Sequence, residues 1–151
     1  MDERLDKAQF VNKHIMAIDY GRKFTGVATF KYGNDPYPIP WGRVGYENDK
    51  QLIKELVQLV NDEFIDIFVL GVPHFTDGKE STLTKEIKIF GTALESALPI
   101  PLYLVDETLT TFEAKQRMEN DPRYNFKVDM KKIDELSATI ILEQFVINSS
   151  N

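Results

Sequence analysis

Three strand-like segments follow one another at the start of the chain, whereas each later strand-like segment comes after a helix-like one. The first three, at 14–20, 24–32 and 37–46, have connections too short for a crossover, so we expect them to pair as an antiparallel meander. The later two, at 66–73 and 101–105, are expected to join in parallel through right-handed crossovers. This order predicts an α/β fold in which one mixed five-stranded sheet carries helices on both faces.

The composition of two segments indicates where they lie in this sheet. The segment 14–20 is apolar at the positions of both faces, which is typical of a central strand. Pro38 and Pro40 place the segment 37–46 at an edge, because proline cannot donate a hydrogen bond to a neighbouring strand. Helices are expected over 49–62, 80–98, 110–118 and 130–147.

The length of 151 residues indicates one domain. Residues 1–13 are polar and are expected to form a flexible arm ahead of a single domain at 14–151. An irregular loop is expected at 120–129, and it is longer than most connections between helices. The chain shows no internal repeat, no low-complexity segment and no linker.

Several classes of protein are excluded or made less favourable by the composition. The absence of cysteine excludes a disulfide framework, a thiolate metal site and a cysteine nucleophile. No apolar run has the length of a signal peptide core or a membrane span, so we expect a cytoplasmic protein without a membrane partner. The net charge of −6 argues mildly against nucleic-acid binding, because lysine and arginine must neutralise phosphates, but it allows a local basic face.

Three acidic residues lie where an α/β sheet typically binds ligands. Asp19 closes the first strand, Glu107 follows the strand at 101–105, and Asp134 stands near the start of the last helix. Ligands of open α/β sheets bind beyond the carboxyl ends of the strands, so the three carboxylates are expected to converge. Carboxylate oxygens are ligands of hard divalent ions, and a pair of such ions can promote phosphodiester cleavage. The pattern therefore predicts a catalytic site that binds Mg²⁺ or Mn²⁺.

Each acidic residue alone also has a simpler explanation. Asp19 could be a turn residue, and Asp134 could be a first-turn acid favoured by the helix dipole. Asp106 and Glu107 could form a solvated strand end. Because neighbouring strand residues point to opposite faces, only one of these two is expected to join a site easily.

Basic and aromatic residues near the three acids are candidates for substrate binding. Two basic pairs flank Asp19 and Asp134. The loop at 120–129 adds two cations that could meet phosphates, Arg123 and Lys127, and two aromatic rings that could stack on bases, Tyr124 and Phe126. The simpler explanations are a solvated turn and an ordinary surface loop. The candidates are Arg22, Lys23, Lys131, Lys132, Arg123 and Tyr124.

Four segments in this order, "AIDYGRKFTGVA", "VLGVPHFTDGKES", "LVDETLTTFEA" and "IDELSATIIL", together resemble the YqgF family of the ribonuclease H-like superfamily. The resemblance runs from about Ile15 to Phe145. It implies a ribonuclease H-like nuclease domain with its acidic positions at Asp19, Glu107 and Asp134. Members are known as pre-16S rRNA nucleases and Holliday junction resolvases. The resemblance thus implies an endonuclease that processes the 5′ end of pre-16S ribosomal RNA, or alternatively one that resolves four-way DNA junctions.

Two departures from the family pattern affect the expected substrate contacts. Thr108 stands where the family usually has an arginine, and Lys132 stands where it usually has a glycine. The partner is expected to be structured RNA or branched DNA. The protein is expected to be a monomer or a weak homodimer, since junction cleavage favours a symmetric dimer. A catalytically silent nucleic-acid-binding module and a nucleotide-binding actin-like fragment remain as other classes.

Overall fold

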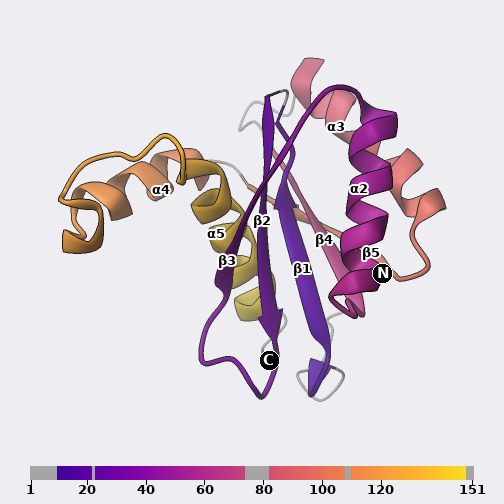
Figure 1. Ribbon diagram of the computed structural model, residues 1–151, viewed down its shortest axis with the longest axis horizontal. Helices are drawn as coiled ribbons and strands as arrows, with labels where there is room; N and C mark the ends of the chain where they lie inside the picture. Colours follow the sequence, from indigo (N-terminus) through magenta and orange to yellow (C-terminus); the bar gives the residue numbers. More distant parts are fainter. Residues whose placement is uncertain (1–9, 22, 74–81, 108–109, 149–151) are drawn as a thin grey trace.

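A computed structural model of the chain describes residues 10–21, 23–73, 82–107 and 110–148 (Figure 1). One sheet has the strand order β3-β2-β1-β4-β5. The β1–β2 and β2–β3 pairs are antiparallel, whereas the β1–β4 and β4–β5 pairs are parallel. The predicted mixed sheet is therefore confirmed. Its strands are β1 (His14–Asp19), β2 (Phe24–Lys31), β3 (Ile39–Gly45), β4 (Ile67–Val72) and β5 (Leu102–Asp106).

Helices cover both faces of the sheet, as predicted. Helices α2 and α3 lie together on one face, whereas α5 lies along the other and carries α4 at its side (Figure 1). The described helices are α2 (Asp49–Asp62), α3 (Thr82–Ala97), α4 (Thr110–Glu119), the 3₁₀ helix η1 (Pro122–Tyr124) and α5 (Ile133–Asn148). Within these described ranges, no helix is long and apolar enough to cross a membrane.

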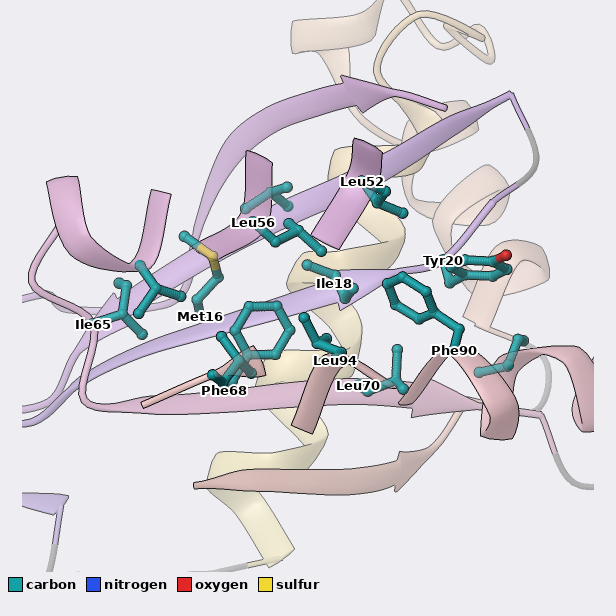
Figure 2. Close-up of a cluster of buried hydrophobic side chains, with 14 of the residues drawn as sticks. Met16, Ile18, Tyr20, Leu52, Leu56, Ile65, Phe68, Leu70, Phe90 and Leu94 are labelled. Carbon is teal, nitrogen blue, oxygen red and sulfur yellow. The ribbon is translucent and has the colours of Figure 1, made fainter. Parts of the chain in front are cut away.

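The alternation of side chains along β1 decides which face each residue meets. Met16, Ile18 and Tyr20 belong to the core beneath α2 and α3 (Figure 2). Ile15 and Ala17 pack in a second core beneath α5. Because strand residues alternate between faces, Asp19 is the next side chain on the α5 face.

Tyr20 connects the end of β1 to helices α2 and α3. Its ring lies 4.4 Å from the Phe90 ring, and its hydroxyl donates a 2.6 Å hydrogen bond to Oδ1 of Asp49 in the first turn of α2. The Tyr46 hydroxyl donates to the same oxygen at 2.8 Å. The residue beside Asp19 is thus held by α2, α3 and the end of β3.

The structure adds detail to two predictions, one on the N-terminal arm and one on the strand with two prolines. Residues 1–9 of the expected arm lie outside the described residues, but Phe10 is buried and its ring lies 5.6 Å from that of Phe145 in α5. Strand β3 forms one edge of the sheet, as its prolines indicated. The register between β2 and β3 shifts at Val27 and Ala28, and Gly42 opposite has a φ of +146° that favours glycine.

Candidate active site

Two of the three predicted acids meet over a glycine of the strand between them. Asp19 ends β1, and Glu107 follows β5, where its backbone N–H donates to the Val72 carbonyl at 3.0 Å. The Glu107 carboxyl donates a hydrogen bond to the Asp19 carboxylate. A Cβ atom on Gly71 of β4 would lie only 3.2 Å from the carboxyl carbon of Glu107. The missing side chain at this position therefore leaves the space that the Glu107 carboxyl occupies.

The electrostatics of this pair favour an added positive charge. Burial raises the pKa of Asp19, and the nearby charge of Asp134 adds to this, although the hydrogen bond from Glu107 opposes it. Burial also raises the pKa of Glu107, reinforced by the negative charges of Asp19 and Asp106. Among the described residues, no basic side chain forms an ion pair with either member. Each carboxyl of this half-buried pair therefore disfavours ionisation of the other.

Asp134, in the first turn of α5, approaches the same end of the sheet as Asp19 and Glu107. In β2, Gly26 pairs directly with Asp19. A Cβ atom on Gly26 would lie 1.8 Å from the backbone oxygen of Asp134, so only glycine allows α5 to begin so close to the sheet. Burial raises the pKa of Asp134, whereas the charge of Arg43 opposes this shift.

The third acid is a neighbour of the pair and does not complete a metal centre. Within the described ranges, no three acidic, histidine or cysteine side chains are arranged so that they could hold a metal ion. The pair itself fits a divalent cation in its chemistry, because its two carboxyls are crowded together and have no basic partner within the described residues. Mg²⁺ often takes only one or two protein carboxylates, together with water and substrate phosphates.

A basic hollow lies beside Asp134. It has a volume of about 520 Å³, and the cations that line it are Lys23, Arg43 and Lys131. Lys132 does not line it, although its charge acts on Glu135. Arg22 lies outside the described residues. The structure therefore brings one member of each predicted basic pair to a common surface.

The loop candidates Arg123 and Tyr124 are held within their own segment. Arg123 forms a two-pronged ion pair with Asp121, with a closest distance of 2.7 Å. Tyr124 packs partly buried against the apolar cluster between α4 and α5. Phe126 of the same loop is instead 60% exposed. Of the two loop aromatics, the exposed one is the ring available to a ligand.

The site also contains residues that sequence reasoning missed. Arg43 was not a candidate, because β3 carries no acidic motif and its register with β2 could not be read from the sequence. Gly26 lay within a recognised segment, but no sequence pattern indicated that α5 passes over it. The usable signal was a glycine inside a strand, which often marks a close backbone approach.

Comparisons with known proteins find relatives over nearly the whole chain. Residues 13–148 match the family model described as "RuvX: Holliday junction resolvase". A Porphyromonas gingivalis protein named "Putative pre-16S rRNA nuclease" is 35% identical over 136 residues, covering 89% of this chain and 96% of the relative. A protein with the same name from Buchnera aphidicola subsp. Baizongia pistaciae is 34% identical over 139 residues, covering 91% and 98%.

A solved structure shares the fold at low sequence identity. Thermus thermophilus RuvC, determined in complex with a Holliday junction substrate, matches with a TM-score of 0.58. The match covers 89% of this chain and 94% of that chain, with 9% identity. The likeness shows that both chains have a ribonuclease H-like fold, which confirms the predicted fold class.

Proposed function

Because this chain belongs to the RuvX family, also called YqgF, we propose that it is a metal-dependent endonuclease that processes the 5′ end of pre-16S ribosomal RNA. Two relatives, 34% and 35% identical, are named for action on this precursor and align over almost their whole length. Family membership favours a nuclease over a nucleotide-binding actin-like fragment. A catalytically silent module is separated from a nuclease by the experiment below.

The observation that carries the proposal is the contact between the carboxyls of Asp19 and Glu107. Two carboxyls in contact beyond the carboxyl ends of β1 and β5 cost free energy, because both are partly removed from water and each disfavours ionisation of the other. A chain that needed only a stable strand end would gain from a neutral residue at either position. The pair is therefore better explained by a cation that binds during function.

Asp19 and Glu107 would hold a divalent cation, and Asp134 lies beside them, where its charge already acts on Asp19. Such an ion lowers the pKa of a bound water and stabilises the leaving oxygen of a phosphodiester. The chain's own part is to hold the carboxyls rigidly. Gly71 leaves room for Glu107, and the bonds of Tyr20 fix the end of β1.

A second candidate function is resolution of four-way DNA junctions. The description of the matching family model favours it. The same carboxyl chemistry would serve either substrate, because both reactions add water across a phosphodiester bond. We place the RNA substrate first on account of the names of the relatives.

The test is an incubation of the purified protein with a pre-16S RNA fragment and with a four-way DNA junction. Each substrate is supplied with Mg²⁺, with Mn²⁺ or with a chelator. We expect the RNA to be cleaved near its 5′ end with either metal, to stay intact with the chelator, and to react faster than the junction. A wild-type protein that binds the RNA but cuts neither substrate would be a silent module.

Substitutions at the acidic pair test which residues act. Changes in the partners of metal ligands typically cost 10–100-fold, so Asp19→Asn and Glu107→Gln, which alter direct ligands, are expected to slow cleavage more than about 100-fold. Asp106→Asn is the matched control, because Asp106 is exposed on the other side of the strand end. Full activity in Asp19→Asn, or equal losses in the Asp106 and Glu107 variants, would contradict the proposal.

A further inference from the structure

One row of paired residues extends the acidic site across the sheet. Asp19 of β1 pairs with Gly26 of β2, and Gly26 pairs with Arg43 of β3. Directly paired residues of antiparallel strands point to the same face, so Asp19 and Arg43 face the same side of the sheet. They are separated by two strand spacings, about 10 Å. The glycine between them leaves the space that the start of α5 occupies.

An aromatic ring holds Arg43 in position, and the charge of Arg43 acts on the nearby carboxyls of Asp134 and Glu135. Its guanidinium carbon lies 3.7 Å from the centre of the Phe24 ring. In the part of the chain that the structure describes, Arg43 has no ion pair. Stacking fixes the guanidinium plane while its N–H donors stay available, an arrangement suited to the bidentate binding of phosphate.

The surroundings of Arg43 select an anionic ligand. Lys23 and Lys131 line the same hollow, so three cations gather there in a chain whose net charge is −6. Phe24, Met130 and Ile133 supply apolar walls, and Asp134, whose charge acts on Asp19 of the acidic pair, also lines the hollow. The only acid lining this hollow within the described residues is thus the one that lies beside the proposed metal site.

We propose that this hollow binds a backbone phosphate of the substrate strand close to the phosphate that is cleaved, with Arg43 as its main anchor. This inference rests on the proposed nuclease function. This contact would hold the substrate strand at a fixed distance from the acidic pair, on the other side of Asp134. Because it reads phosphate and not base edges, it strengthens the binding of many sequences alike.

Binding of a fluorescent single-stranded RNA and of a DNA of the same sequence, measured with chelator over a range of salt concentrations, tests this site. Arg43→Gln is expected to weaken both by about 10-fold and to lower the slope of log affinity against log salt by about one. Arg43→Lys keeps the charge but loses the flat stacked plane, so it should retain the slope and lose part of the affinity. Phe24→Leu should resemble Arg43→Lys.

The matched control is Lys54→Gln, which removes an exposed cation from α2 on the other face of the sheet. It should leave affinity and salt slope unchanged. Wild-type cleavage of the precursor RNA, measured in parallel, separates the two levels of the proposal. If the wild type cleaves but Arg43→Gln binds like the wild type with the same slope, the phosphate site is wrong and the nuclease function stands. If the wild type neither binds nor cleaves, both are wrong.

Discussion

Gly71 is the residue on which the contact between the two carboxyls depends. It lies in β4, between the strands that lead to Asp19 and Glu107. An added Cβ would come within 2.5 Å of the Ile141 side chain and within 3.2 Å of the Glu107 carboxyl. The first contact concerns packing, and the second concerns the site. A methyl group here should therefore affect stability and activity for separable reasons.

We expect Gly71→Ala to destabilise the protein by about 1–3 kcal/mol through overpacking and to reduce cleavage strongly by displacing Glu107. Thermal unfolding and cleavage rates measure the two effects. Adding Ile141→Val removes the atom in closest contact, so the double variant should recover stability while cleavage stays low. Recovery of both would mean that Gly71 serves packing alone.

Helix α5 brings Asp134 close to the sheet because its first turn packs directly on Gly26 of β2, which has no side chain. The Asp134 carbonyl lies where a Cβ of Gly26 would be, so any side chain there meets backbone that cannot rotate away. The neighbouring strand offers a contrast at Gly45, where an added Cβ would have nothing within 4 Å. Substitution at Gly45 therefore measures the effect of replacing a glycine alone, whereas substitution at Gly26 also displaces α5.

We expect Gly26→Ala to lower the free energy of unfolding by about 3 kcal/mol or more, because α5 must move as a whole. Gly45→Ala should change it by less than about 1 kcal/mol. Chemical denaturation of both variants measures the difference. Similar small effects would show that α5 does not rest on β2 as closely as described.

The two aromatic rings of the loop between α4 and α5 lie in different surroundings. Tyr124 packs against the cluster that joins the two helices, whereas Phe126 is exposed and has a φ of +57°. The Phe126 and Lys127 backbone N–H groups donate to carbonyls of Asp121 and Tyr124. The turn is thus built to present Phe126 outward.

We expect Tyr124→Ala to cost about 1–2 kcal/mol of stability, less than the 3–5 kcal/mol of a fully buried aromatic residue. Phe126→Ala should leave stability within about 0.5 kcal/mol and weaken single-stranded RNA binding by about 1–3 kcal/mol, the worth of one stacked base. Denaturation and RNA titration of both variants measure this. Unaltered binding in Phe126→Ala would leave an ordinary surface loop.

The sequence predicted elements better than it predicted contacts between them. The strands and helices follow from apolar periodicity and from connection lengths, which act within short stretches of chain. The row from Arg43 through Gly26 to Asp19 depends on the register of two strand pairs, which includes a shift at Val27. Such a register is set by packing across the whole sheet, so Arg43 could not be placed from its neighbours in sequence.

At the scale of the whole molecule, the acidic pair connects stability to pH. Burial raises the pKa values of Asp19 and Glu107, so the folded protein holds more protons than the unfolded chain once pH exceeds about 4, where free carboxyls ionise. Stability falls with rising pH wherever the folded state binds more protons. The contribution of this pair is therefore favourable in acid and is lost as pH rises through its raised pKa values.

We expect the metal-free protein to lose thermal stability between about pH 5 and about pH 8 at this site, and Mg²⁺ to restore it most at the higher pH. Glu107→Gln keeps a hydrogen-bond donor to Asp19 but carries no charge. It should therefore melt higher than the wild type at about pH 8 with chelator, by about 2–4 °C for each kcal/mol gained. Added Mg²⁺ should raise the melting temperature of this variant little. Asp106→Asn should respond to Mg²⁺ as the wild type does, with a slightly weaker pH dependence because Asp106 adds to the raised pKa of Glu107. If Glu107→Gln melted lower than the wild type at the higher pH, the contact between the two carboxyls would stabilise the fold. The pair would then give no support for a cation site.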